Sequence, residues 1–228
     1  MESCNGFALL ARATRGELTD SWHYGSAAVV TPDGRLVARL GDVEKQAFLR
    51  SAAKPLQGLP LLLAGGWERY RLETADLALV CASHAGTEEH AERAEGLLSR
   101  AGLEVKDLHC GAHEPFDRGA ARRLCEAGLD ATPLHNNCSG KHAGMLLACL
   151  LLDLPLETYT EPGHPLQQRC LEEVASFCGV AEGEIGVATD GCGLPTYRVP
   201  LAAAARAYAW LADPEASDLT PDLSLIHI

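Results

Sequence analysis

The sequence predicts an α/β (α+β) fold in which helices pack on a β-sheet. Its opening, up to about residue 40, is rich in β-forming residues, whereas later segments carry apolar residues at helical spacing. With 228 residues, of which 47% are hydrophobic, the chain is long enough to bury a substantial core. No repeat or low-complexity linker divides it into separate domains.

The first expected element is a β-hairpin, because β-rich runs at 27–30 and 35–40 flank the turn signal Thr31-Pro32-Asp33-Gly34. From Phe48 to Gly66, helical spacing predicts a helix interrupted by two prolines. The remaining expected elements are a strand over 77–81, helices over 88–100, 143–152, 165–178 and 201–211, a strand over 184–189 and a tight turn over 190–195.

The charge balance excludes some classes of partner. Only 19 lysines and arginines stand against 31 acidic residues, which gives a formal net charge of −12 and argues against a nucleic-acid partner. The longest apolar run, 145–152, is far shorter than the ~20 residues that span a bilayer. The N-terminus carries an acid where a secretory signal carries positive charge. We therefore expect a cytoplasmic protein without a membrane segment.

The cysteines are expected to be free thiols. There are nine, an odd number, and no two of them form a CxxC pair. A chain of this length does not need disulfides to fold. Cys149, Cys170 and Cys178 fall at apolar positions of expected helices and are predicted to be core residues.

Ser51 and Lys54 form an S-x-x-K pattern near the start of the helix expected after Phe48. On a helix this spacing places two Cβ atoms about 5–6 Å apart on one face. A lysine whose pKa is lowered by desolvation can deprotonate a serine, so the pattern suits an acyl-transfer nucleophile. A capped helix with a solvated lysine is the alternative, and Pro55 disfavours helical angles at Lys54.

Ser83 and His84 follow the expected strand at its junction with the next helix. A nucleophile or an oxyanion loop is often placed at such a junction, although Ser83 could equally be the N-cap of that helix. His84, taken alone, is more often a packed or capping residue than a catalyst.

A second polar loop, 135–142, ends directly on a buried helix and contains several reactive side chains. Its Cys138 and the distant Cys192 each lie in a glycine-containing turn and could meet to hold a soft metal, whereas buried free cysteines are the alternative. The nearby His109, Cys110 and His113 match no firm metal template and are interpreted as loop and core residues.

Five segments, taken in order, resemble the rhizobial-type L-asparaginase family: FLRSAAKPLQ, CASHAGTEEH, LHNNCSGKHAGML, EPGHPLQ and DGCGLPT. Several long motifs in the correct order are far more specific than one S-x-x-K pattern. The resemblance implies a fold similar to that of serine β-lactamases and penicillin-binding proteins. It also implies a homodimer that hydrolyses L-asparagine to L-aspartate and ammonia.

The same resemblance implies roles for individual residues. Ser51 would be the nucleophile and Lys54 its base, while Ser83 would belong to a second serine and lysine arrangement. The expected ligands of an accessory Zn²⁺ site beside the substrate are Cys138, Lys141 and Cys192. The residues expected to line the pocket or to support the zinc site are Arg50, His84, His142 and Asp190.

The C-terminal part differs from the family pattern. Family members continue further and carry there the lysine that pairs with the second serine, whereas no lysine follows Lys141 in this chain. We therefore expect an incomplete asparaginase-like domain over 1–211 and an unmatched tail over 212–228, with foreign-looking residues at 223–228. The missing part is expected to leave apolar sheet surface uncovered and to lower stability and activity.

The sequence thus predicts a cytoplasmic amidohydrolase that acts on L-asparagine through an acyl-enzyme on Ser51. One alternative is another S-x-x-K acyl-transferase, such as a glutaminase or a β-lactam-handling protein. The other is a zinc-binding fragment without catalytic activity.

Overall fold

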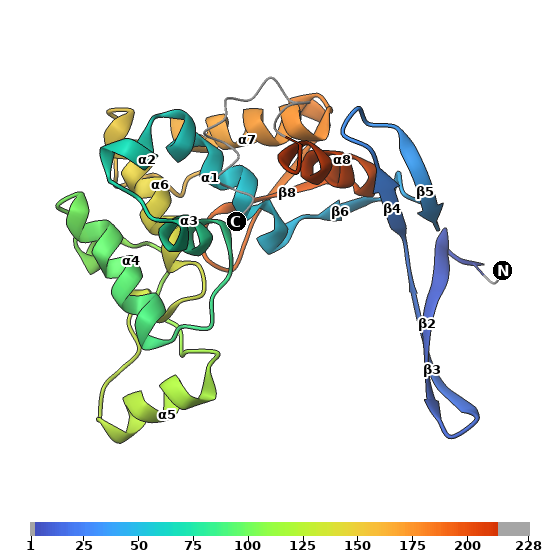
Figure 1. Cartoon of the computed structure of the whole chain (residues 1–228), viewed down its shortest axis with the longest axis horizontal. Coiled ribbons are helices and arrows are strands. Elements are labelled where there is room, and N and C mark those ends of the chain that lie inside the picture. The colour runs from blue at the N-terminus through green and yellow to red at the C-terminus, as the bar shows by residue number, and fades with distance from the viewer. Residues whose placement is uncertain (1–2, 214–228) are drawn as a thin grey trace.

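The computed structural model describes residues 3–213 (Figure 1). The helices gather into one body, and the N-terminal hairpins extend from it on one side (Figure 1). Of the predicted tail, residues 214–228 lie outside the described part of the chain. Between residues 3 and 213, no helix is long and apolar enough to cross a bilayer.

The mixed α/β class is confirmed, but the described strands form three small antiparallel sheets in place of one continuous sheet. Their orders are β1-β2-β3, β4-β5 and β6-β8-β7. The strands are β1 (Ser3–Cys4), β2 (Phe7–Arg15), β3 (Leu18–Gly25), β4 (Ala27–Val30), β5 (Leu36–Leu40), β6 (Gln46–Phe48), β7 (Gly186–Thr189) and β8 (Pro195–Pro200).

The predicted hairpin is confirmed as β4 and β5. The amide of Gly34 donates to the carbonyl of Thr31 over 2.8 Å, and Gly34 has a φ of 85°, which glycine adopts without strain. A second hairpin precedes it, because β2 and β3 pair across a turn at Gly16, with a φ of 61°. The sequence pattern does not separate this hairpin from the alternating segment around it.

Three of the predicted helices have the expected bounds, namely those at 88–100, 165–178 and 201–211. The helix expected over 143–152 begins earlier, at Ser139. The helices are α1 (Lys54–Leu63), α2 (Gly66–Arg69), α3 (Thr74–Cys81), α4 (Glu88–Arg100), α5 (Arg118–Glu126), α6 (Ser139–Leu151), α7 (Pro165–Cys178) and α8 (Leu201–Leu211). Short 3-10 turns are η1 (Arg50–Ala53), η2 (Val105–Asp107), η3 (Pro133–His135) and η4 (Glu182–Glu184).

The strand predicted over 77–81 is wrong, because these residues form the end of α3. The helix begins at a capping box in which the amide of Glu73 donates to the Asp76 carboxylate over 2.9 Å. A short apolar run that is buried on more than one side has no clear period, so the sequence pattern could not distinguish a strand from a helix.

The core of the helical body is α6, whose residues from Ser139 to Cys149 are all buried. Helix α3 packs against it at close range through two glycines. A Cβ atom on Gly140 would lie 2.4 Å from the carbonyl oxygen of Leu79, and one on Gly144 would lie 2.7 Å from a methyl group of Val80. The two helices can therefore approach this closely only because both positions lack a side chain.

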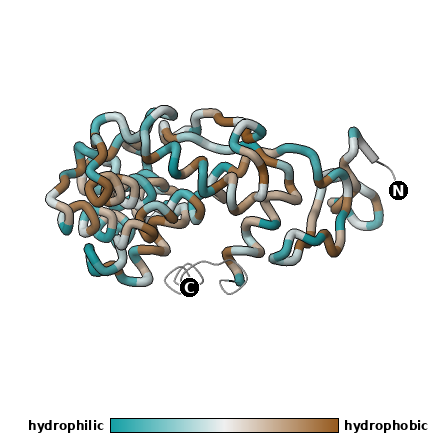
Figure 2. Tube along the Cα trace, turned by 90° about the horizontal axis from the view of Figure 1, so that it is seen from above, coloured by the Kyte–Doolittle hydropathy of each residue, from teal (hydrophilic) through white to brown (hydrophobic). Residues whose placement is uncertain are grey.

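Several large apolar side chains on the N-terminal hairpins are exposed. The tube in Figure 2 shows apolar residues along this extension as well as in the helical body. Among those on β2 to β5, the largest exposed fractions belong to Leu18 (78%), Val29 (56%), Val37 (54%) and Trp22 (52%). Apolar sheet surface is thus open to solvent in the described chain.

Asp76 is a fully buried carboxylate that ties α3 to α4. Arg100 and Arg93 hold it over 2.6 and 2.9 Å. Burial raises its pKa, but hydrogen bonds from Arg100, the Glu73 amide and Arg93 outweigh this effect and lower the pKa below its usual value. The ionised carboxylate therefore stabilises the fold above the pKa of the unfolded chain, and this stabilisation is lost as the pH falls through the lower folded-state pKa.

We expect Asp76→Asn to lower the free energy of unfolding by about 2–3 kcal/mol at pH 7, less than for a fully buried pair because both arginines reach solvent. Chemical denaturation at pH 7 and at about pH 3 measures this, and the difference from the wild type should shrink at the lower pH. Asp20→Asn is the control, because its ion pair with Arg15 is exposed. Equal effects of the two substitutions would contradict the assignment.

Candidate active site

Arg50 and Ser51 begin the turn that follows β6. Arg50 has a left-handed backbone, with a φ of 51°, which costs a residue with a side chain about 1–3 kcal/mol. Its guanidinium is held by Asp190, with Nη2 and Oδ1 2.7 Å apart. Ser51 follows directly and is exposed. Strained backbone of this kind concentrates at functional sites, so its position agrees with a role for Ser51.

Lys54 is buried, with 1% of its surface exposed, and its amine has three acceptors. The Nζ atom donates to the carbonyls of Ala82 and Asn137 over 3.0 and 2.9 Å and to the Ser83 hydroxyl over 3.0 Å. Burial is the main cause that lowers its pKa. Lys54 adopts helical angles, with φ −59° and ψ −40°, although proline follows it.

The predicted pairing of Lys54 with Ser51 differs from the observed one. Within residues 3–213, no hydrogen bond joins the two side chains, and the serine bound to Lys54 is Ser83. The physical reason is that a buried ammonium needs acceptors, and the carbonyls of Ala82 and Asn137 draw the amine inward. Ser51 and Lys54 remain neighbours along one turn, but the amine points to the second serine.

Ser83 is not the N-cap of α4, which begins after Thr87. The next residue, His84, is buried and connects the serine loop to α6. Its Nδ1 accepts from the amide of Gly86 over 3.2 Å, so Nε2 carries the proton and donates to the Ser139 hydroxyl over 2.9 Å. Burial, followed by the neighbouring His90, lowers the pKa of His84 to about 4, so the ring is neutral at pH 7.

Cys138 and Cys192 come together as the sequence predicted. Cys138 directly precedes α6, and Cys192 lies in the turn between β7 and β8. A hydrogen bond from Cys138 lowers the pKa of Cys192 far below that of a free thiol, and the same bond raises the pKa of Cys138. The Nζ atom of Lys141 lies 3.4 Å from the Cys192 sulfur. The pair therefore favours one thiolate, on Cys192, beside a cation.

Two buried residues to which the sequence analysis gave no role hold this cluster in place. The Asn136 amide donates to the carbonyls of Cys110 and Gly111 over 2.9 and 3.1 Å and accepts from the amide of Cys138 over 2.9 Å. The Tyr159 hydroxyl lies 2.7 Å from Nδ1 of His142. Their other partners, the Cys110 and Gly111 carbonyls and the His142 ring, lie 17 or more residues away, so the local sequence pattern does not show these contacts.

One cavity of about 310 Å³ joins the serine turn to the thiol pair. His113 also lines it, so the interpretation of His113 as a simple loop or core residue was incomplete. The residues around this cavity are Arg50, Ser51, His113, Phe116, Asn136, Asn137, Cys138, Asp190, Gly191 and Cys192.

Ser83 and His84 line a different cavity, of about 280 Å³, which also contacts His90 and Arg93. Lys54 binds residues of both regions, because Asn137 lines the first cavity and Ser83 the second.

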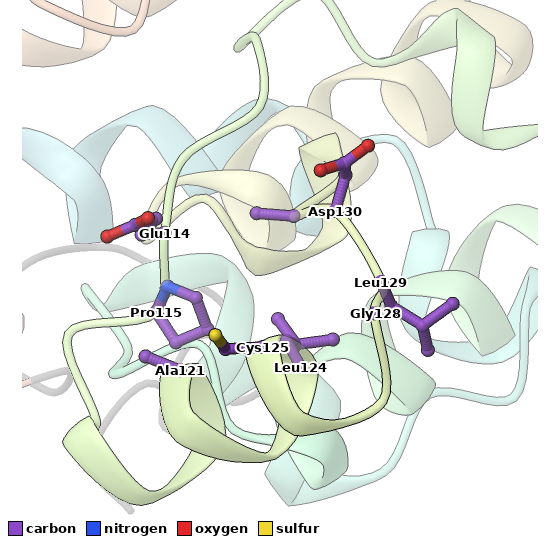
Figure 3. Close-up of a pocket in the computed structure, with 9 residues that line it drawn as sticks. Glu114, Pro115, Ala121, Leu124, Cys125, Gly128, Leu129 and Asp130 are labelled. Carbon is purple, nitrogen blue, oxygen red and sulfur yellow. The ribbon is translucent and has the colours of Figure 1, made fainter.

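Figure 3 shows a further cavity, of about 360 Å³, beside α5. None of the residues that line it belongs to the predicted site.

The donors around Cys192 fit a zinc ion only if Lys141 takes part. Within residues 3–213, no three His, Cys, Asp or Glu side chains form a group that could hold a metal ion. The two sulfurs are in hydrogen-bond contact with each other, and the Lys141 amine lies 3.4 Å from the Cys192 sulfur, so the predicted set does come together. Sulfur donors suit zinc, and the ligating amine must be neutral.

A family model described as L-asparaginase II matches residues 11–226 of the chain. This match covers nearly the whole sequence and includes every residue of the candidate site. No curated protein matches the chain.

Proposed function

Since the chain belongs to the L-asparaginase II family, we propose that it is an amidohydrolase that converts L-asparagine to L-aspartate and ammonia. The observation that carries the proposal is the single cavity that presents Ser51 beside the Arg50 and Asp190 ion pair. A free amino acid carries one carboxylate and one ammonium group. Arg50 and Asp190 offer the complementary charges at that cavity, next to a hydroxyl nucleophile.

In the proposed reaction, the Ser51 hydroxyl attacks the side-chain amide carbon of the substrate. The C–N bond breaks, the leaving nitrogen takes up a proton to depart as ammonia, and an ester on Ser51 remains. Water then cleaves the ester to release L-aspartate. Lys54 is the base for Ser51 in this scheme, and the lowered pKa of its amine favours that role.

To act as the base for Ser51, Lys54 must be neutral, and a neutral amine has two N–H donors, so it must give up one of the three hydrogen bonds that the ammonium group donates. Of the three partners of the amine, only Ser83 can exchange a proton with it, because the serine hydroxyl can both accept and donate. The carbonyls of Ala82 and Asn137 can only accept. We propose that Ser83 passes a proton to and from Lys54 during the two half-reactions. Catalytic hydrogen bonds often tighten only in the substrate complex.

We further propose that Cys138, Lys141 and Cys192 hold an accessory Zn²⁺ beside the substrate. When bound, zinc supplies a positive charge that polarises and orients a carbonyl oxygen. The chain's own contribution is the placement of the ligands, since the Asn136 side chain fixes the backbone at Cys138.

We expect Cys138→Ser to weaken zinc binding by about 100-fold or more, because even outer-shell substitutions cost metal sites 10–100-fold. Metal analysis of the purified protein and competition with a chelating dye measure this. Cys125→Ser is the matched control, since Cys125 is an exposed free thiol outside the site. Equal zinc content in both variants would rule out the site.

The proposed substrate is tested by ammonia release from L-asparagine and L-glutamine and by turnover of a chromogenic β-lactam. Asparagine is expected to react fastest. A preference for glutamine or for the lactam would identify another acyl-transferase. Bound zinc without turnover of asparagine, glutamine or the lactam would identify a zinc-binding protein without catalytic activity. The hydrogen bond of Lys54 to Ser83, which leaves Ser51 without its base, would agree with that result.

We also propose that the active form is a cytoplasmic homodimer, as the family resemblance implies. Sedimentation velocity at micromolar concentration tests the dimer, and a monomer with full activity would refute it.

A further inference from the structure

Residues 113–116, which we call the wall segment, lie between two cavities just before α5. His113 and Phe116 line the candidate active-site cavity of about 310 Å³. Glu114 and Pro115 line the cavity of about 360 Å³ beside α5, and Figure 3 shows both of these residues at its edge. One short segment therefore presents two of its side chains to each cavity.

Hydrogen bonds hold the wall segment on both sides. Before it, the carbonyls of Cys110 and Gly111 accept from the Asn136 side chain over 2.9 and 3.1 Å. After it, the amide of Asp117 donates to the carbonyl of Ala85 over 2.9 Å. The segment thus has a defined position at the cavity, as a residue that determines specificity requires.

The imidazole of His113 has a defined proton position. Its Nδ1 atom lies 2.6 Å from the carbonyl oxygen of Glu114, and because a carbonyl can only accept, Nδ1 carries a proton. In the neutral ring, Nε2 is then unprotonated and is a hydrogen-bond acceptor. Within residues 3–213, the Glu114 carbonyl is the one hydrogen-bond partner of this ring. The Nε2 atom is therefore available to a ligand.

Phe116 adds an aromatic ring beside this acceptor. The centroids of the Phe116 and His113 rings are 4.9 Å apart, with the ring planes at 54°, and 62% of the phenylalanine surface is exposed. The face of an aromatic ring attracts a cation, and an unprotonated imidazole nitrogen accepts from an N–H group. Both side chains therefore favour an ammonium group over a carboxylate.

The acidic residue of the same cavity cannot satisfy an ammonium group alone. Oδ1 of Asp190 already lies 2.7 Å from Nη2 of Arg50 and accepts from the Gly191 amide over 2.8 Å. Within the described residues, this leaves Oδ2 as the carboxylate oxygen that is open to a substrate. An ammonium group has three N–H donors, so it needs further acceptors in the cavity.

We propose that His113 and Phe116 are specificity-determining residues that receive the α-ammonium group of the substrate. Nε2 of His113 accepts from one N–H group, Oδ2 of Asp190 accepts from another, and the Phe116 ring attracts the charge. The wall segment thus selects free amino acids over amides that lack an ammonium group. The inference rests on the proposed function for the identity of the substrate, but its test requires only binding.

The test compares the affinity of L-asparagine with that of succinamate, which is the same amide acid without the ammonium group. Both compounds are titrated by calorimetry into the Ser51→Ala variant, which keeps the cavity but lacks the proposed nucleophile. L-Asparagine is expected to bind about 10-fold or more tightly than succinamate, which is the usual effect of a hydrogen bond to a charged group.

Further substitutions in this variant separate the two sides of the wall segment. His113→Leu should weaken binding of L-asparagine about 10-fold and leave that of succinamate unchanged. His113→Gln should retain most of the affinity, because its side-chain carbonyl can accept. Phe116→Leu keeps an apolar side chain and should weaken binding of L-asparagine about 2–5-fold. Glu114→Gln is the matched control, because Glu114 lines the other cavity, and it should change neither affinity.

An equal loss of both affinities in His113→Leu, or a similar loss in Glu114→Gln, would overturn the proposal, because the segment would then act only through its shape. Equal or undetectable binding of the two compounds by Ser51→Ala would overturn it as well. Ammonia release by the wild type is measured separately. Selective binding without ammonia release would refute the amidohydrolase but support the role of the wall segment, whereas ammonia release without selective binding would refute that role alone.

Discussion

Ser51→Ala is expected to lower kcat/KM for L-asparagine by roughly 10³-fold or more, because it removes the proposed nucleophile. The fold should be preserved, since Ser51 is exposed and the N-cap residues of η1 and α1 are Leu49 and Ala53. Steady-state ammonia release measures the rate, and thermal unfolding shows that the variant is intact. Ser99→Ala, on the far end of α4, is a control that should leave both quantities unchanged.

A trapping experiment separates the two serines of the site. An asparagine analogue with a diazoketone in place of the amide should label Ser51, and peptide mass mapping identifies the modified residue. Ser83→Ala should reduce the rate of labelling but leave its position unchanged, because Ser83 acts through Lys54. Label on Ser83, or normal turnover by Ser51→Ala, would show that the serine bound to Lys54 is itself the nucleophile.

Lys54→Met should reduce turnover by about 10²–10⁴-fold, the usual range for loss of a general base. Methionine fills much of the same space, but three acceptors lose their donor, so the free energy of unfolding should also fall by about 1–3 kcal/mol. Lys54→Arg distinguishes a base from a fixed charge, since arginine keeps the charge but does not deprotonate. Rescue of activity by arginine would refute the role of Lys54 as a base.

Lys45→Met is the matched control for this substitution. Lys45 donates to the carbonyl of Asn5 over 2.7 Å and lies over the ring of Phe7, and it does not line the cavity. Its replacement should leave turnover unchanged. A similar loss of activity in both variants would mean that Lys54 acts only through stability.

The sequence predicted those parts of the fold that have a clear local signal. The helices at 88–100 and 165–178 were placed correctly because their apolar residues recur at helical spacing. The β4–β5 hairpin was found from its Pro-Asp-Gly turn. In contrast, α3 was taken for a strand because residues 77–81 form a short apolar run that is packed on more than one side.

The site was predictable where chemistry is concentrated in one loop and less so where it depends on distant contacts. Cys138 and Cys192 were paired from their reactive side chains and turn context, and they meet in the structure. The spacing of Ser51 and Lys54 did not show that the amine binds Ser83 instead, because the carbonyls that orient it belong to other segments. Tyr159 carries no motif at all.

The glycine contact between α3 and α6 has a consequence for how this sequence can vary. Gly140, on α6, lies in the sequence between the proposed zinc ligands Cys138 and Lys141. The carbonyl that its Cβ would touch belongs to α3, the helix that leads into Ser83. A methyl group at this position would act as a spacer that separates the serine loop from the thiol loop. In random mutagenesis, Gly140 and Gly144 should therefore tolerate fewer replacements than the half-buried Gly96, which has no atom within 4 Å of its potential Cβ.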